Sequence, residues 1–138
     1  MGRIEIRPFA DTRDEPAGGH QRSQQDSKLT PEQLACSVRR YHEGGDDLPQ
    51  MIEVTVPPGI TIPSHAHEEP EIIYVTEGEL RFGSQALPAR SSVFVPGNTL
   101  YSFTAGPDGA RFLNFRPCRV KTYITKDEFV ARRRPSAE

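Results

Sequence analysis

The stretch "SHAHEEPEIIYVTEG", Ser64 to Gly78, carries two histidines one residue apart, three glutamates and a compact apolar run. Successive side chains of a β-strand point to opposite faces, so His65 and His67 share a face. Glu71 has the same parity and joins them if the bend at "EEP" preserves it. Two imidazoles and one carboxylate are a common ligand set for a catalytic divalent metal. Spacing alone leaves a second interpretation open, in which both histidines are exposed beside a solvated acidic run.

The composition predicts one domain with no strongly charged partner. The chain has 138 residues, with 17 basic and 19 acidic side chains, so bulk charge does not argue for nucleic acid or a membrane. No N-terminal apolar segment resembles a signal peptide, and we expect a cytoplasmic protein. Cys36 and Cys118 are too few and too far apart for a disulfide framework, and Cys36 is expected to be a buried small hydrophobe.

The 13 prolines and 11 glycines favour short strands joined by turns. Between turn signals, the apolar patterns predict strands at 4–7, 36–41, 50–56, around the histidine pair, and at 71–76, 79–83, 92–96, 100–105 and 110–117. Turns are expected at 77–78 and 106–109, and loops at 10–28 and 85–92. Thr30 and Thr125 each begin a short helix with capping-box spacing. This pattern predicts an all-β sandwich or small barrel.

The histidine stretch resembles the first motif of the cupin superfamily. That motif runs glycine, five residues, His-x-His, three residues, glutamate, six residues, glycine, and is matched by Gly59, His65, His67, Glu71 and Gly78. The resemblance implies a double-stranded β-helix, the cupin jelly-roll barrel, with short terminal helices. It also implies one divalent transition metal (Fe, Zn, Ni or Mn) in the barrel mouth, and a homodimer.

The second cupin motif is degenerate here. The family pattern has a glycine, five residues, Pro-x-Gly, two residues, a third metal histidine, three residues and an asparagine. Aligned on Pro96, those positions hold Arg90, Asn98, Tyr101 and Ala105, so only the proline is kept. Tyr101 takes the place of the third histidine, and the prediction for the metal site is therefore His65, His67, Glu71 and Tyr101.

Three roles are open for Tyr101. It binds the metal through its phenolate, or it transfers a proton as a general acid or base, or it only fills the barrel. His42 is a minor candidate for a replacement ligand, and Arg81 and Arg90 are minor candidates for binding an anionic group. The other polar residues considered are expected to be solvated; they are Glu68, Glu69, His20 and Arg132 to Arg134. Tyr74, of opposite parity to Glu71, is expected to face outward.

We divide the chain into residues 1–35, an N-terminal strand and flexible arm, 36–120, the barrel, and 121–138, a C-terminal helix and tail. Since one fold hosts many activities, function must come from the site. The first hypothesis is a metal-dependent enzyme that transfers a proton on a small oxygenated molecule, as a lyase, isomerase or cyclase. The second is a non-haem iron dioxygenase, and the third is a non-enzymatic module that binds a small ligand.

Overall fold

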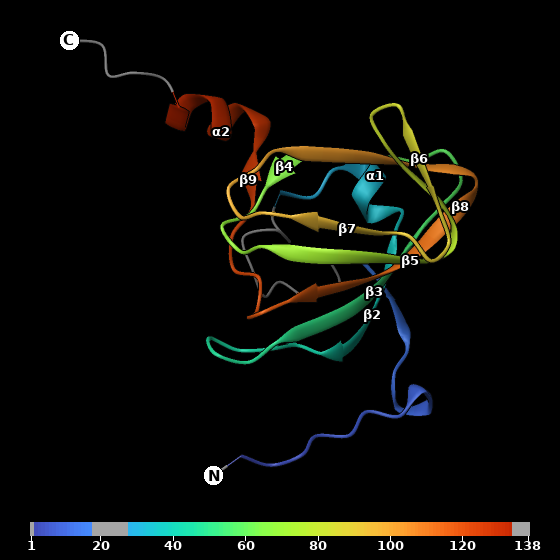
Figure 1. Cartoon of the computed structure of the whole chain (residues 1–138), viewed down its shortest axis with the longest axis vertical. Coiled ribbons are helices and arrows are strands. Elements are labelled where there is room, and N and C mark those ends of the chain that lie inside the picture. The colour runs from blue at the N-terminus through green and yellow to red at the C-terminus, as the bar shows by residue number, and fades with distance from the viewer. Residues whose placement is uncertain (1, 18–27, 134–138) are drawn as a thin grey trace.

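The computed structural model describes residues 2–17 and 28–133, and these form an antiparallel barrel with short helices (Figure 1). Nine strands are β1 (Asp14–Pro16), β2 (Ser37–His42), β3 (Gln50–Val56), β4 (Thr61–Ala66), β5 (Glu71–Phe82), β6 (Gln85–Pro88), β7 (Ser92–Val95), β8 (Tyr101–Arg116) and β9 (Ile124–Thr125). They are joined in the order β1-β2-β3-β8-β4-β9, and β5 pairs with β6, β7 and β8. The predicted all-β jelly-roll fold is confirmed.

Two long strands hold the barrel together. The first part of β8 pairs with β4, its last part pairs with β3, and β5 pairs along both parts. The expected turn at 77–78 is wrong, because Glu77 and Gly78 pair with Arg111 and Ala110 of β8. The expected turn at 106–109 lies inside β8, whose strand is continuous there, but these four residues bulge between the partners of Gly78 and Leu80. Register shifts next to Gly78 let β5 bend without ending. The loop expected at 85–92 is also partly wrong, since β6 pairs with β5 there.

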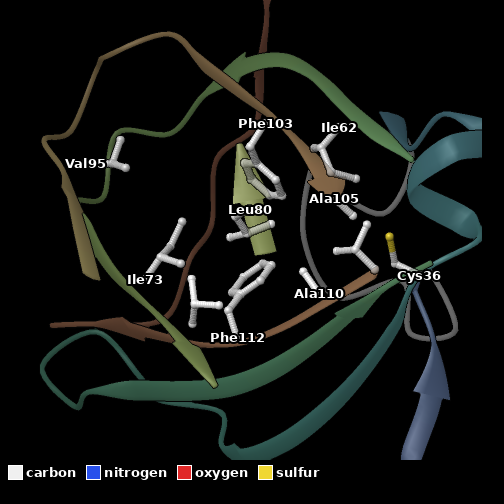
Figure 2. Close-up of a cluster of buried hydrophobic side chains, with 11 residues drawn as sticks. Cys36, Ile62, Ile73, Leu80, Val95, Phe103, Ala105, Ala110 and Phe112 are labelled. Atoms are coloured by element: carbon white, nitrogen blue, oxygen red, sulfur yellow. The ribbon is translucent and has the colours of Figure 1, made fainter. Parts of the chain in front are cut away.

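The barrel is filled by apolar side chains from both halves (Figure 2). Those buried most completely include Val56, Ile73, Val75, Leu80 and Phe112. Their odd or even numbering follows the inward face of each strand, as the sequence predicts. Cys36 lies at the edge of this cluster, and burial raises the pKa of its thiol to about 11. This thiol is therefore a small core hydrophobe, as expected.

The N-terminal part differs from the prediction in two respects. Residues 4–7 form no strand, and the loop expected at 10–28 is partly wrong because it contains β1, which pairs with β2. The two helices, α1 (Pro31–Leu34) and α2 (Lys126–Arg133), begin as expected, with Thr30 and Thr125 accepting from the backbone N–H three residues on. A short 3-10 turn, η1 (Phe9–Asp11), precedes β1. No helix in the described part of the chain is long and apolar enough to cross a membrane.

The degenerate second motif keeps the backbone conformation of its glycines. Among the described residues, the non-glycine residues with positive φ are Arg90 (76°) and Asn98 (57°), the two that replace family glycines. The left-handed region is costly for residues with a Cβ, although Asn tolerates it better than most. The substitutions therefore left the turns in place, and Arg90 carries the larger backbone strain.

We expect Arg90→Gly to raise the free energy of unfolding by about 1 kcal/mol, because glycine adopts this φ without a Cβ penalty. The Arg90 side chain is exposed, so little packing is lost. Asn98→Gly is the matched control and is expected to raise the free energy of unfolding by less. Urea denaturation measures both, and a destabilised Arg90→Gly protein would contradict the strain argument.

Candidate functional site

The two histidines of the opening stretch lie inside the barrel mouth. His65 is on β4 and His67 follows its last residue, and their side chains are 4% and 3% exposed. His65 Nδ1 is 2.8 Å from the carbonyl of Pro63, and His67 Nδ1 is 2.5 Å from the carbonyl of Thr122. A ring nitrogen that donates to a carbonyl leaves Nε2 as a lone-pair donor, which is the form that binds metals.

Both imidazoles are held neutral. Burial lowers the pKa of His65, and burial together with the positive charge of Arg116 lowers that of His67 to about 4. The ring centroids lie 5.0 Å apart. Two neutral imidazoles so close together form a ligand pair that needs no deprotonation at neutral pH.

Glu71 is the third inward residue, as its parity predicts, and only 2% of it is exposed. Its Oε2 accepts from Asn114 Nδ2 at 2.6 Å and from Arg116 Nη2 at 2.7 Å. Burial, the largest single effect, raises the pKa of Glu71, but the Arg116 guanidinium and the Tyr101 and Asn114 hydrogen-bond donors together lower it more. The other oxygen, Oε1, is buried and has no hydrogen-bond partner among the described residues. Glu71 is therefore an ionised carboxylate whose Oε2 is held by Asn114 and Arg116, with the Tyr101 hydroxyl close beside it.

Tyr101 lies directly beside His65. The two residues are paired across β4 and β8, and their ring centroids are 4.6 Å apart. Burial and the nearby carboxylate of Glu71 raise the pKa of Tyr101 well above its usual value. The phenol is therefore protonated at neutral pH and able to give up a proton to a substrate, rather than being a preformed phenolate.

A C-terminal loop covers the outer side of the histidines. Tyr123 stacks on His65 with ring centroids 4.8 Å apart and planes within 7°, and its hydroxyl accepts from Gln33 at 2.9 Å. Glu69 accepts from the hydroxyl of Thr122 at 2.7 Å and fixes the loop whose carbonyl holds His67. Glu68 is exposed, as expected, but the prediction of a solvated Glu69 is wrong because this loop binds it.

A cavity of about 610 Å³ opens beside these groups. Its polar lining comprises His65, His67, Tyr101, Asn114 and Arg116 together with Gln33, Arg40, Glu43, Gln50 and Arg119, whereas Glu71 does not line it. Its apolar lining includes Val38, Val54 and Val56 on β2 and β3 and Phe103 and Phe112 on β8. This volume and mixture are typical of a site for a small organic molecule.

Two of the predicted ligands, His65 and His67, are suited to bind a divalent metal. The two Nε2 atoms are available, and the unpartnered Oε1 of Glu71 suits a third ligand. Within residues 2–17 and 28–133, however, no three His, Cys, Asp or Glu side chains are gathered as a ready metal site. Arg116 competes for the carboxylate, so the four-residue set stays a prediction.

The minor candidates lie elsewhere. His42 lines a separate polar groove beside the N-terminal segment and not the main cavity. Arg81 is exposed and pairs with Glu79 at 2.8 Å, and Arg90 is exposed too. Arg132 and Arg133 are exposed on α2, while His20 and Arg134 fall outside the described residues.

Sequence reasoning missed Asn114 and Arg116. The signal was present in "ARFLNFRP", where both share the inward parity of the buried Phe112. Burying a polar side chain without a hydrogen-bond partner costs free energy. Polar residues at inward positions of a strand are therefore candidates for a functional site. Tyr123 and Thr122 lie in a segment without strand periodicity, and no comparable signal marks them.

Comparisons with known proteins agree with this geometry. Residues 52–115 match the sequence profile of the cupin domain. Over these residues the chain is similar to cupin domains. The matched residues include both histidines, Glu71, Tyr101 and Asn114. No curated protein sequence is significantly similar to the chain.

Solved structures show the same cupin fold. The polyketide cyclase RemF from Streptomyces resistomycificus is 21% identical, with a TM-score of 0.64 over 98% of this chain and 94% of its own. An RmlC-like cupin from Ralstonia eutropha is 16% identical, with a TM-score of 0.64 over 94% and 84%. Bacillus subtilis oxalate decarboxylase OxdC is 16% identical, with a TM-score of 0.62 over 98% of this chain and 36% of its own. These likenesses establish the fold, and enzymes are among the proteins that share it.

Proposed function

We propose that this cupin is a metal-dependent enzyme that transfers a proton on a small oxygenated molecule, as a lyase, isomerase or cyclase. One observation carries the proposal: two neutral histidines and a protonated tyrosine meet at the wall of one cavity. His65 and His67 would hold the metal, with Glu71 Oε1 as third ligand. When bound there, the metal polarises a substrate carbonyl or carboxylate oxygen.

Tyr101 is the proton donor in this proposal. Its hydroxyl is protonated at neutral pH and stands among the two histidines and Glu71. A substrate oxygen or carbanion that gains negative charge beside it takes its proton, and the positive charge of Arg116 stabilises the same negative charge. Val54, Val56 and Phe112, which also line the cavity, would shield a substrate carbon from water.

The substrate follows from the two sides of the cavity. A small molecule with an oxygen function at one end places that end against His65, His67 and Tyr101. Its hydrocarbon or aromatic part then lies against the apolar residues of β2, β3 and β8. An enolisable carbonyl compound has both features.

The dioxygenase hypothesis is less well supported than proton transfer. A facial triad would use the same His65, His67 and Glu71, so the ligands do not separate the two hypotheses, whereas the protonated Tyr101 beside them favours proton transfer. A binding module without catalysis would need no protonated tyrosine beside the histidines. Oxygen consumption during turnover separates the first of these alternatives from the proposal.

Metal content tests the first half of the proposal. Protein purified from medium containing Fe, Zn, Ni and Mn is expected to carry about one equivalent of one of them, measured by plasma mass spectrometry. His65→Ala is expected to lose it, because one of two imidazole ligands is gone. His42→Ala is the matched control and should keep it, since His42 lines a different groove. Protein that neither contains nor takes up any of these metals would contradict the proposal.

Tyr101→Phe tests the second half. Proton exchange into a panel of 1,3-dicarbonyl compounds is followed in D₂O by NMR, and the variant is expected to be about 10²–10⁴-fold slower with its metal retained. Loss of metal together with activity would instead make Tyr101 a ligand. Undiminished exchange would leave it only a packing role and refute proton transfer from its hydroxyl.

A further inference from the structure

One short loop contacts both candidate metal histidines from their outer side. Residues 117–123, which we call the covering loop, join the end of β8 to β9, and β9 pairs with β4 (Figure 1). The carbonyl of Thr122 accepts a hydrogen bond from His67 Nδ1, and the ring of Tyr123 stacks on His65. The position of this loop therefore affects both imidazoles.

The two histidines are held in different ways. His65 Nδ1 lies 2.8 Å from the carbonyl of Pro63, two residues earlier on the same strand, so β4 itself supplies this partner. His67 follows the last residue of β4, and its partner Thr122 is 55 positions away. The orientation of His67 therefore depends on a contact that its own strand does not supply.

Thr122 uses all its polar groups on the histidine stretch. While its carbonyl accepts from His67, its hydroxyl accepts from the backbone N–H of Glu68 at 2.8 Å and donates to Glu69 Oε2 at 2.7 Å. Its backbone N–H donates to Glu69 Oε1 at 3.2 Å. A threonine offers one backbone donor, one backbone acceptor and a hydroxyl that does both. All of these groups are thus bound to three successive residues, 67–69.

The carboxylate of Glu69 is the main anchor of the covering loop near His67. Besides the two groups of Thr122, its Oε1 accepts from the backbone N–H of Lys121 at 2.8 Å. Hydrogen bonds to an ionised acceptor are about twice as strong as neutral ones, so three of them hold this part of the loop firmly. The ion pair between Lys121 and Asp46 lies on the surface, with side chains 57% and 80% exposed, and contributes little.

The surroundings of His65 do not depend on Glu69. The stacked Tyr123 has anchors of its own, because Gln33 donates to its hydroxyl at 2.9 Å and Lys28 donates to its carbonyl at 2.8 Å. His65 should therefore keep its environment when Glu69 is changed, which makes it an internal reference for His67.

We propose that Glu69 is a positioning residue for the bound metal, which acts by holding Thr122 so that its carbonyl stays on His67 Nδ1. A carbonyl can only accept, so this contact keeps the proton of the neutral imidazole on Nδ1 and leaves Nε2 as the lone-pair donor. Glu69 itself is no ligand in this proposal. The inference rests on the proposed function in one respect, because it takes His65 and His67 as the metal ligands.

Loss of the Glu69 carboxylate would release His67 without removing a ligand. The covering loop would lose three hydrogen bonds at the point where it meets the imidazole. Without the Thr122 carbonyl in place, either ring nitrogen can carry the proton, and an imidazole with a protonated Nε2 cannot bind a metal through that atom. Removing such a partner of a ligating histidine typically weakens metal binding about 10–100-fold.

The tautomer of His67 in metal-free protein is the first measurement, because it needs no metal to bind. In ¹⁵N NMR spectra of the histidine side chains, with His67→Asn used to assign the signals, the wild type is expected to show a protonated Nδ1 and an unprotonated Nε2. Glu69→Ala should give a mixture of both tautomers at His67 and leave His65 unchanged. Glu68→Ala removes the same charge from the exposed neighbouring residue and is the matched control, with both rings as in the wild type.

Metal affinity is the second measurement. Competition for Zn²⁺ with a chromophoric chelator is expected to show binding about 10–100-fold weaker in Glu69→Ala than in the wild type. Glu69→Gln should lose less affinity, because its amide oxygen still accepts from the two backbone N–H groups of the covering loop. Glu68→Ala should bind Zn²⁺ as the wild type does. Circular dichroism checks that each variant is folded, and Glu69→Gln carries the comparison if Glu69→Ala does not fold.

Three results would overturn the positioning role: an unprotonated Nδ1 at His67 in the wild type, an unchanged tautomer in Glu69→Ala, or a changed tautomer without any loss of Zn²⁺ affinity. Equal losses in Glu68→Ala and Glu69→Ala would also overturn it, because charge alone would then explain them. A wild type that binds no divalent metal contradicts the proposed function instead. The tautomers of the metal-free proteins then still decide whether Glu69 holds His67.

Discussion

Arg116→Met is expected to lower the free energy of unfolding by about 3–5 kcal/mol, because it leaves the carboxylate of Glu71 buried without its counter-ion. The two side chains are 5% and 1% exposed and their charged atoms are 2.7 Å apart. Arg116 also donates to Gln50 at 3.1 Å, so its removal opens a network that joins β3, β5 and β8. Asn114 alone cannot neutralise the carboxylate. Urea denaturation of metal-free protein gives the difference.

The same strand offers a matched control. Arg111 pairs with Glu77 at 3.4 Å, and these side chains are 37% and 67% exposed. Arg111→Met is therefore expected to cost less than about 1 kcal/mol. Adding Glu71→Gln to Arg116→Met should recover part of the lost free energy of unfolding, since the buried, unpaired carboxylate is then removed. Equal losses for the two arginine variants would show that burial of the ion pair is unimportant.

Gly78→Ala is expected to lower the free energy of unfolding by more than about 3 kcal/mol, or to prevent folding. Gly78 has a φ of 72°, and a Cβ there would lie 2.1 Å from the carbonyl oxygen of Gly109. That oxygen belongs to β8, which is paired with β5 at this point, so neither backbone is able to move away. The energy therefore includes a steric clash in addition to the unfavourable φ.

Gly83→Ala is the control for the φ alone. Gly83 has a φ of 61°, and a Cβ there would meet nothing within 4 Å. Its substitution is expected to cost about 1–2 kcal/mol. Gly59, at the start of the first cupin motif, has the same open surroundings and should behave like Gly83. If Gly78→Ala unfolds at the same urea concentration as Gly83→Ala, the close approach of β5 and β8 is not rigid.

Most single elements could be predicted from local patterns. The capping box at Thr30 and the strands around Val38, Val54 and Ile73 were correct because alternation and caps depend on neighbouring residues. The errors fell where strands bend. At Gly78 and Gly109 the sequence predicts turns, yet pairing of Gly78 with Ala110 carries β5 through the first position, and residues 106–109 form a bulge within β8 at the second.

The sequence by itself determined which side chains face the interior. His65, His67 and Glu71 share a parity, which predicts one face if the bend between β4 and β5 preserves it, and all three are buried. Only the tertiary structure decided what those residues do to one another. Arg116 reaches Glu71 from 45 positions away, and Tyr123 stacks on His65 from a loop without any periodic pattern. Such partners depend on strand register and on the bends of β5 and β8, which arise from long-range pairing and not from local residue order.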